Sequence, residues 1–237
     1  AGVAQKEGES RLNLLKRNKE VFRSIIGPVT DSGFNGIFLV ATNPVDIMTR
    51  ITYELSGFNP KRVLGTGTAL DTARLRYLLG DYLHVDPRNI HAYVMGEHGD
   101  SEFVPWSQAM IATRPIREIL EETENPVQME ELTRISEEVR GAAYRIIEAK
   151  QATYYGIGMA MTRITKAILG DESSVLTVSA MLRGEYGQNG VFTGVPCIIN
   201  QDGVQRVLTL KLSQEEQSQM TSSCDLLRDS FCGLENL

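Results

Sequence analysis

The feature that most constrains the fold is a continuous apolar run over residues 37–41, Ile-Phe-Leu-Val-Ala. Such a run is typical of a strand buried on both faces of a parallel sheet. Before it, apolar residues recur at helical spacing and predict a helix over residues 12–30. After it, Asn43 is expected to cap a helix that has Pro44 at its first position and ends near residue 55.

A short strand over residues 63–65 and a helix over 70–82 continue this alternation. The order of helix, buried strand, helix and strand predicts a doubly wound α/β sheet. The second half of the chain indicates an α+β architecture with antiparallel strands. The strands expected there cover residues 91–95, 175–182, 191–200 and 204–212, with a hairpin turn over 201–203 between the last two. The helices expected there cover residues 129–147, after an N-cap at residue 125, and residues 154–169. A final helix is marked by Met220, Cys224, Leu227 and Phe231. The helix over 154–169 is apolar or small on nearly all sides, so we expect it to be buried.

Composition excludes several classes of protein. Of the 237 residues, 42% are hydrophobic and 23% are charged, which is close to a globular average and unlike a disordered, collagen-like or disulfide-scaffold chain. The net charge of −6 argues against a nucleic-acid binder or a basic membrane-surface protein. No apolar run approaches the roughly 18 to 20 residues of a membrane span. The three cysteines, Cys197, Cys224 and Cys232, have no CxxC spacing and fit a reducing cytoplasm.

The first candidate site is the sequence Gly-Glu-His-Gly-Asp at residues 96–100, just after an expected strand. Loops at strand ends carry reactive groups in α/β proteins, and the His98 imidazole can both give and take a proton near neutral pH. The alternative is an ordinary solvated loop histidine.

A second candidate lies on the helix over residues 70–82. Asp71 and Arg74 are three residues apart and therefore share a face, whereas Arg76 points to the other side. The pair is either an ordinary surface ion pair or a functional one. In the functional case Asp71 orients a histidine, and Arg74 binds a carboxylate with two hydrogen bonds.

Other patterns are weaker. The polar segment over residues 5–11 is either a solvated loop or a mobile lid that brings Arg11 onto a substrate. Two Gly-x-Gly pairs, at 65–67 and 156–158, lack the third glycine of the phosphate-binding fingerprint. The three histidines are spread over a helix end, a strand and a loop, so we predict no metal site.

Taken in order, these segments resemble a known family. Its motifs match Gln5 to Arg11, residues 40–46 (Val-Ala-Thr-Asn-Pro-Val-Asp), residues 65–74, residues 96–101 and residues 152–156. The chain strongly resembles the bacterial-type L-lactate dehydrogenases of the lactate/malate dehydrogenase superfamily, essentially from end to end. The resemblance implies the C-terminal part of a Rossmann-type parallel sheet, within residues 1–67 and including a catalytic lid loop at 1–11. It also implies an α+β catalytic and substrate domain over residues 68–237.

The resemblance also implies an NAD-dependent hydride-transfer site that interconverts pyruvate and (S)-lactate. His98 is similar to the family's proton donor and acceptor, Asp71 to the carboxylate that stabilises its imidazolium, and Arg11 to the lid residue that polarises the carbonyl. The substrate-binding residues it implies are Gln5, Arg11, Asn43, Arg74 and Thr153. The NAD-contacting residues it implies are Gly2, Val3, Ser24, Ala41, Thr42, Asn43, Thr66 and Ile157.

Gln5 bears on the choice of substrate. Malate dehydrogenases of this superfamily have an arginine at the matching position, because their substrate carries a second carboxylate. A neutral Gln5 leaves that charge unpaired in a desolvated site, which favours pyruvate over oxaloacetate. Other neutral 2-hydroxy acids remain alternatives, as does malate itself.

Arg76 and His91 resemble the pair that binds fructose 1,6-bisphosphate between subunits of the allosteric bacterial enzymes. We therefore expect activation by this bisphosphate, with both residues either in that site or plain surface residues. The resemblance further implies a cytoplasmic homotetramer that catalyses the last step of glycolytic, homolactic fermentation.

The chain departs from the family pattern at its front, where the Gly-x-Gly-x-x-Gly turn and the acidic residue for the adenosine ribose are lacking. The expectation is a fragment of such an enzyme that leaves a sheet edge uncovered, is unstable or inactive alone, and does not bind NADH stoichiometrically. A rival hypothesis is a structural protein that retains the fold, although His98, Asp71, Arg74 and Arg11 are all present. A hydrolase would need a nucleophile, and no serine lies in a recognisable elbow.

Overall fold

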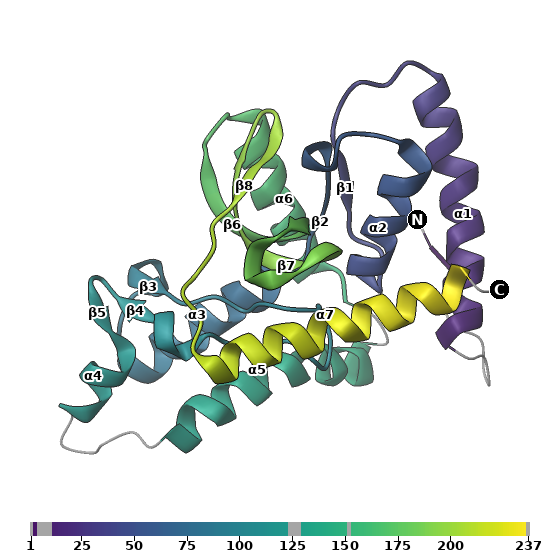
Figure 1. Cartoon of the computed structure of the whole chain (residues 1–237). Helices are drawn as coiled ribbons and strands as arrows, with labels where there is room; N and C mark the ends of the chain where they lie inside the picture. Colours follow the sequence, from purple (N-terminus) through teal and green to yellow (C-terminus); the bar gives the residue numbers. More distant parts are fainter. Residues whose placement is uncertain (1, 4–10, 123–128, 151–152, 236–237) are drawn as a thin grey trace.

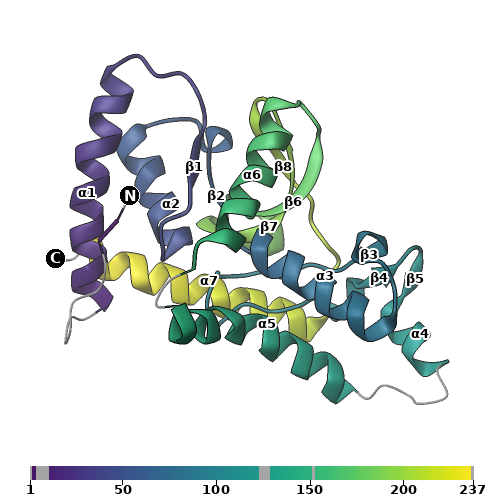
Figure 2. The ribbon, with the colours of Figure 1, turned by 180° about the vertical axis from the view of Figure 1, so that it is seen from behind.

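The computed structural model describes residues 2–3, 11–122, 129–150 and 153–235. Helices pack around a sheet with the strand order β1-β2-β6-β7-β8, and a small sheet with the order β3-β4-β5 lies at the end of the molecule opposite α1 (Figures 1 and 2). The large sheet consists of β1 (Phe38–Val40), β2 (Val63–Gly65), β6 (Ser174–Arg183), β7 (Asn189–Asn200) and β8 (Gly203–Val207). The small sheet consists of β3 (Ile90–His91), β4 (Met110–Ile111) and β5 (Arg114–Pro115).

The helices account for most of the remaining described chain. The α-helices are α1 (Arg11–Asp31), α2 (Val45–Ser56), α3 (Ala69–Leu83), α4 (Ile116–Glu121), α5 (Met129–Lys150), α6 (Tyr155–Leu169) and α7 (Gln214–Glu235). Short 3₁₀ helices are η1 (Pro60–Arg62), η2 (Pro87–Asn89), η3 (Trp106–Gln108) and η4 (Glu185–Gly187). None of the helices in the described part of the chain is long and apolar enough to cross a membrane.

The large sheet joins a parallel part to an antiparallel part. β1 and β2 are parallel, with Phe38 opposite Val63, and α2 connects them. β2 then meets β6 in antiparallel orientation at a single residue pair, Gly65 with Ser179. β6, β7 and β8 continue as an antiparallel meander. The predicted fold class, a parallel α/β part followed by an α+β part with antiparallel strands, is therefore confirmed.

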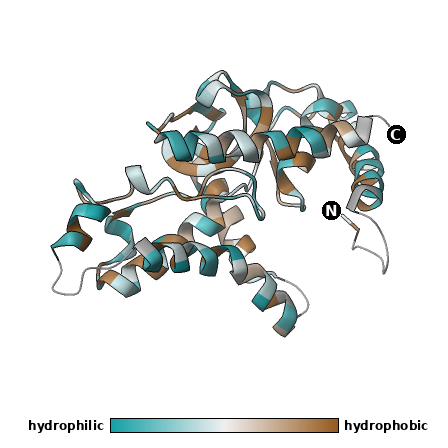
Figure 3. Ribbon diagram, turned by 60° about the horizontal axis from the view of Figure 1, so that its bottom comes forward, coloured by the Kyte–Doolittle hydropathy of each residue, from teal (hydrophilic) through white to brown (hydrophobic). Residues whose placement is uncertain are grey.

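Two hydrophobic cores lie on either side of the loop that carries His98. The larger is formed by the five-stranded sheet with α1, α2, α6 and α7, and the smaller by α3, α4, α5 and the small sheet. Figure 3 shows hydrophobic segments gathered in the strands at the centre, while the long helices alternate hydrophilic and hydrophobic residues. Met95 and Phe103 belong to the larger core and exchange two backbone hydrogen bonds of 2.8 and 2.9 Å. These bonds close the base of the loop 96–102 and fix it between the cores.

Most of the predicted elements are present, with shifts at their ends. The predicted helices over 12–30, 70–82 and 129–147 correspond to α1, α3 and α5, and the hairpin turn over 201–203 joins β7 to β8. The predicted start of α5 at residue 125 lies outside the described residues. Met220, Cys224, Leu227 and Phe231 are all buried on α7, as expected from their spacing.

Four expectations about these elements were wrong. Asn43 does not cap α2: Pro44 occupies the N-cap position in an extended conformation, and no side chain caps the helix. The strand expected over 91–95 is only β3, because residues 94–96 turn away to form the base of the His98 loop. The strand expected over 204–212 ends at Val207, after a register shift against β7.

The fourth concerns α6, which is not buried on nearly all sides. Tyr155 and Leu169 are 83% and 82% exposed, and Met159 is 68% exposed. Only Ala160, Ile164 and Ala167 are buried on this helix. Apolar composition alone therefore did not reveal that one side of α6 has no partner within the described chain.

Candidate active site

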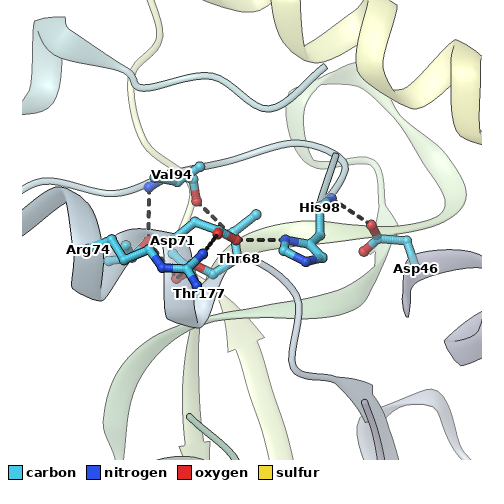
Figure 4. A network of polar contacts seen from close by, with 8 residues as sticks. Asp46, Thr68, Asp71, Arg74, Val94, His98 and Thr177 are labelled. Atoms are coloured by element: carbon cyan, nitrogen blue, oxygen red, sulfur yellow. Dashed lines mark hydrogen bonds and ion pairs between the residues drawn. The ribbon is translucent and has the colours of Figure 1, made fainter. Parts of the chain in front are cut away.

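The centre of the site is a hydrogen bond between His98 and Asp71. The distance between His98 Nδ1 and Asp71 Oδ2 is 2.7 Å, and the side chains are 23% and 3% exposed. Asp71 lies in the first turn of α3, and His98 lies on the loop 96–102 (Figure 4). Because Nδ1 faces the carboxylate, the other ring nitrogen, Nε2, remains for a substrate.

Tight backbone packing positions the His98 loop. Gly96 has φ +91°, and a Cβ there would lie 2.7 Å from the Ser223 hydroxyl oxygen. The Gly96 N–H donates to Gly194 O on β7 at 3.0 Å, and the Gly194 N–H donates back to Gly96 O at 2.8 Å. The Glu97 N–H donates to Ser223 Oγ on α7 at 2.7 Å. The loop is thereby attached to both the sheet and α7.

Asp46, in the first turn of α2, attaches the loop from another direction. It is 2% exposed, and its Oδ2 accepts the His98 backbone N–H at 2.9 Å (Figure 4). Its Oδ1 has no hydrogen-bond partner among the described residues. Burial raises the pKa of Asp46 to about 6, although the neighbouring Ser179 side chain and the His98 N–H favour the ionised form.

Buried threonines hold the start of α3. Thr68 Oγ1 donates to Val94 O at 2.7 Å, and the Val94 N–H donates to Thr72 Oγ1 at 2.9 Å. Thr177 on β6 donates to Thr72 Oγ1 at 2.8 Å (Figure 4). This network connects α3, β6 and the segment that leads to His98, so Asp71 and His98 are held in register.

The electrostatics of the pair favour a protonated histidine. Burial opposes a charge on the ring, but the hydrogen bond and negative charge of Asp71 outweigh it, and the charges of Asp46 and Glu102 add to them. Together they raise the pKa of His98 to about 9. At neutral pH the ring is therefore an imidazolium, ready to donate a proton.

Arg74 lies beside the pair. Its Nη1 is 3.3 Å from Asp71 Oδ1, and its side chain is 19% exposed. The start of α6 packs against this region, since a Cβ at Gly156 would lie 3.2 Å from the Leu70 side chain and 3.8 Å from Arg74 Nη2. A half-buried guanidinium in this position is suited to a carboxylate ligand.

A cavity of about 370 Å³ opens in front of the histidine. Its walls come from α1, the β1–α2 connection, α3, the His98 loop and α5, and they consist of Leu14, Asn43, Pro44, Asp71, His98, Gly99, Asp100, Glu102, Arg140, Ala143 and Tyr144. Asn43 is exposed on this wall. Leu14 lies one turn after the start of α1, so the helix that begins at Arg11 starts beside the cavity.

A hollow lies beside the carboxyl end of β1. The Thr66 N–H donates to Val40 O at 2.8 Å, which places Thr66 beside residues 41–42 at the strand ends. A Cβ at Gly2 would lie 2.7 Å from Thr42 Cγ2, so a larger residue there would displace the Thr42 side chain. The hollow, of about 260 Å³, is lined by α1, β1, Ala41, Thr42, Thr52 and Met161. In parallel α/β sheets this edge is the usual place for a nucleotide cofactor.

The remaining predicted residues occupy different places. Val3 is half-buried, with its N–H bonded to Asn18 Oδ1 at 2.8 Å, whereas Ser24 is exposed and donates to Val21 O within α1. Thr153 and Ile157 are half-buried at the start of α6. Gln5 and the Arg11 side chain lie outside the described residues.

Arg76 points away from Arg74, as predicted. Its Nε donates to Ala92 O at 3.0 Å, and its guanidinium lies 4.9 Å from the Tyr93 ring centroid. His91 is exposed on β3, one residue before Ala92. Arg76 also lines a separate cavity of about 380 Å³ between α3, α6 and β6.

Sequence reasoning missed three residues of this site. Glu102 and Arg140 line the cavity in front of His98, and Asp46 holds the His98 backbone. Glu102 lies four residues after His98, and Asp46 follows the Asn-Pro-Val sequence, so both lie in or beside the motifs that the sequence displays. Arg140 lies in a helix of ordinary amphipathic pattern and gave no signal.

Fold and site together fit an α/β enzyme whose cavity carries a histidine–aspartate pair with an arginine beside it. The comparisons with known proteins agree. Residues 1–65 match the family model of the lactate/malate dehydrogenase NAD binding domain, and residues 68–235 match that of the lactate/malate dehydrogenase alpha/beta C-terminal domain.

Named relatives are similar over nearly the whole chain. An L-lactate dehydrogenase 2 of Bacillus cereus is 53% identical over 98% of this chain and 73% of its own length. An L-lactate dehydrogenase 1 of Bacillus cereus is 50% identical over the same shares. The crystal structure of minor L-lactate dehydrogenase from Enterococcus mundtii in the ligands-bound form has a TM-score of 0.94 and 47% identity, and covers 98% of this chain and 74% of its own.

The chain belongs to the lactate/malate dehydrogenase family. It is an NAD-dependent 2-hydroxy acid oxidoreductase with a Rossmann-type part, as the resemblance implied. NAD as the cofactor is likewise confirmed. The individual roles of the site residues and the domain boundary at 67 and 68 stay predictions.

Proposed function

We propose that this chain interconverts pyruvate and (S)-lactate as an NAD-dependent L-lactate dehydrogenase. The observation that carries the proposal is the His98–Asp71 pair at the wall of a 370 Å³ cavity, with Arg74 beside it. The identity of 53% to a protein named L-lactate dehydrogenase 2 supports the choice of substrate.

The proposed mechanism assigns each residue one task. Arg74 binds the substrate carboxylate, and this orients the carbonyl toward His98. His98 donates its Nε2 proton to the carbonyl oxygen as that oxygen becomes a hydroxyl, and takes the proton back in the reverse direction. Asp71 stabilises the imidazolium through the hydrogen bond at Nδ1. NAD, when bound, supplies or accepts the hydride.

The supporting residues complete the proposal. Asn43 and Thr153 contact substrate, and Arg11 at the start of α1 polarises its carbonyl when residues 1–11 close as a lid. Gly2, Val3, Ser24, Ala41, Thr42, Asn43, Thr66 and Ile157 contact NAD. These roles divide the chain into a cofactor domain over 1–67 and a catalytic domain over 68–237.

Gln5 decides between the two substrates of the family. We propose that its neutral side chain selects pyruvate, because the second carboxylate of oxaloacetate would stay unpaired in a closed site. The test is NADH oxidation with pyruvate and with oxaloacetate, in the enzyme and in Gln5→Arg. A strong pyruvate preference that Gln5→Arg moves toward oxaloacetate supports the proposal. Equal turnover of the two acids would identify a general 2-hydroxy acid dehydrogenase, and no turnover would identify a non-catalytic relative.

Arg76 and His91 support a second, regulatory proposal. Arg76 lies on the opposite side of α3 from Arg74 and lines a cavity of about 380 Å³. We propose that fructose 1,6-bisphosphate binds Arg76 and His91 and raises the affinity for pyruvate. The measurement is the pyruvate KM with and without the bisphosphate, in the enzyme and in Arg76→Gln. An unchanged KM in the enzyme, or the same response in the variant, contradicts the proposal.

The exposed apolar side of α6 supports assembly. Tyr155 and Met159 are 83% and 68% exposed, and Met159 lines the same cavity as Arg76. We propose that subunits meet over this side in a homotetramer, so that the bisphosphate site lies near a subunit contact. We propose that the enzyme acts in the cytoplasm, where it catalyses the last step of homolactic fermentation and regenerates NAD.

A further inference from the structure

Glu102 is a buried acid of the site to which the mechanism above gives no task. It is 5% exposed and lies on the loop of His98. It lines the cavity in front of His98 and also a polar cavity of about 250 Å³ behind that loop. Arg140 on α5 lines both cavities too, and its Nη2 donates to the Glu102 backbone O at 2.8 Å. Glu102 and Arg140 therefore form the wall between the two cavities.

The Glu102 carboxylate lies close to the catalytic pair. One of its oxygens, one Asp71 oxygen and one His98 ring nitrogen all lie within 4.8 Å of one another. The carboxylate has no hydrogen bond with any residue that the structure describes, so no neighbour there fixes its protonation state. It is a third ionisable group beside a pair that transfers protons.

Charged groups from two other elements also act on it. Asp71 and Arg74 lie on α3 and Arg140 on α5, and their charges act on the Glu102 carboxyl together with that of His98. The remaining charged residues around the polar cavity are Arg117 on α4, Glu137 on α5, and Glu215 and Glu216 on α7.

The charge of this cluster depends on the state of His98. While His98 is an imidazolium, its positive charge balances a second carboxylate beside Asp71. Once His98 has given up its proton, its positive charge no longer offsets the repulsion between the Asp71 and Glu102 carboxylates, which lie within 4.8 Å of each other. That repulsion disfavours ionisation of one of the two. Burial raises the pKa of Glu102 to about 8, with Asp71 adding to the rise and His98, Arg140 and Arg74 opposing it. Glu102 thus titrates in the same range as His98.

We propose that, on the alkaline side of neutrality where its carboxylate is ionised beside the imidazolium, Glu102 is a positioning residue of the reaction, which takes up a proton when His98 loses one and releases it when His98 is reprotonated. The proton balance is simple. His98 gives its Nε2 proton to the substrate oxygen, and the Glu102 carboxylate binds a proton from solvent that enters the polar cavity, so the net charge of the cluster stays constant. In the oxidative direction both transfers reverse. This inference rests on the proposed lactate dehydrogenase activity and extends it to a residue beyond the His98–Asp71 pair.

The test is the pH dependence of kcat/KM in Glu102→Gln, measured in both directions with the full chain and NAD. Glutamine keeps the shape of the side chain and removes its charge. Without that charge the His98 imidazolium is less stabilised, so its pKa falls. The alkaline limb of pyruvate reduction and the acidic limb of lactate oxidation should both move to lower pH by about one unit. A residue with a purely structural role would lower the rates without moving either limb.

Two further variants sharpen this result. Glu102→Asp retains an acid, and its pH limbs should return toward those of the unaltered enzyme. Glu137→Gln is a matched control, since Glu137 lines the same polar cavity but is exposed. It should leave both limbs unchanged. An equal shift in Glu137→Gln would assign the effect to the net charge of the cavity and overturn the role of Glu102.

A direct titration keeps the proposal testable if Glu102→Gln is inactive. The chain has three histidines, so the ring resonance of His98 can be assigned in NMR spectra by its loss in His98→Asn. The His98 titration should move to lower pH in Glu102→Gln. An unmoved titration contradicts the inference. The two proposals fail separately, because absence of pyruvate reduction in the unaltered enzyme contradicts the activity, whereas unmoved limbs in an active enzyme contradict only the role of Glu102.

Discussion

At the scale of single residues, the charge around His98 determines the pH range of the reaction. Asp71, Asp46 and Glu102 raise its pKa from 6.5 to about 9. Pyruvate reduction needs the protonated ring, so kcat/KM for pyruvate should stay level through neutral pH and fall tenfold per unit above about 9. Lactate oxidation needs the neutral ring and should rise over the same interval. A steady-state pH profile in both directions checks this, and a limb near 6.5 would contradict the role of Asp71.

The same shift has a consequence for stability. The folded pKa of His98 lies above its unfolded value, so its charged form stabilises the fold. This contribution is fully present below about 6.5 and is lost as pH rises toward about 9. Urea unfolding of His98→Gln should therefore differ from that of the unaltered protein more at low pH than at high pH. A stability difference that grows with pH would show that the histidine is neutral in the folded state.

Part of the site could be predicted from single residues. Asp71, Arg74 and His98 lie in short local motifs, so the sequence makes them candidate site residues, and the family resemblance implies their roles in proton transfer and carboxylate binding. Asp46 contacts His98 across 52 positions of sequence. No local pattern carries that information, because the contact depends on how α2 packs beside the loop.

At the scale of elements, the hydrogen bond from the His98 backbone N–H to Asp46 Oδ2 attaches the His98 loop to α2, and one substitution removes it. Asp46→Ala leaves the partly buried His98 N–H without its acceptor, which is expected to cost about 2 kcal/mol of unfolding free energy. The loop should also shift, so activity should fall with stability. Urea unfolding and kcat/KM measure the two effects. Asp225→Ala is the control, since the exposed Asp225 pairs with Arg228 in a surface ion pair on α7.

Gly96 tests the packing of the loop itself. Its φ is +91°, and a Cβ there would lie 2.7 Å from Ser223 Oγ, which leaves no room for alanine. Gly96→Ala should cost roughly 1 to 3 kcal/mol and displace His98. Gly158→Ala is the matched control, because Gly158 lies within α6 with no atom of a non-neighbouring residue within 4 Å of its Cβ position. That substitution should stabilise the helix by roughly 0.5 to 1 kcal/mol. Similar losses in both variants would contradict a local cause.

The elements themselves were predictable where periodicity is strong. α1, α3 and α5 show clear helical spacing, and β7 with β8 shows a turn signal between them. The cap of α2 was not predictable from Asn43 and Pro44, since the sequence Asn-Pro also suits an extended connection, which is what Pro44 adopts. The exposure of α6 was not predictable either, because an apolar helix face has the same sequence pattern whether it packs inside the subunit or outside it.

At the scale of the whole molecule, the strand order of the large sheet determines which strands have neighbours on both sides and which lie at its edges. β8 and β1 are the outer strands of the described sheet, and β1 has a hollow of about 260 Å³ beside it. An edge left uncovered by a missing segment stays a prediction. The expected instability and weak NADH binding of the isolated chain stay predictions. The order of elements in the sequence predicts a parallel part followed by an antiparallel part of the sheet. It does not predict that the single residue pair Gly65–Ser179 joins the two parts.

The exposed side of α6 leads to a prediction about assembly. Met159 is 68% exposed beside Tyr155, and burying a methionine side chain is worth about 1.5 to 3 kcal/mol. Met159→Glu should therefore weaken subunit association by roughly 10- to 100-fold and shift sedimentation toward smaller species. Leu226→Glu, on α7 and 40% exposed, is the control and should leave the sedimentation coefficient unchanged. If Leu226→Glu dissociates the assembly and Met159→Glu does not, subunits meet over α7 instead. In that case the cavity that holds Arg76 lies away from the contact, and the proposed link between bisphosphate binding and assembly fails with it.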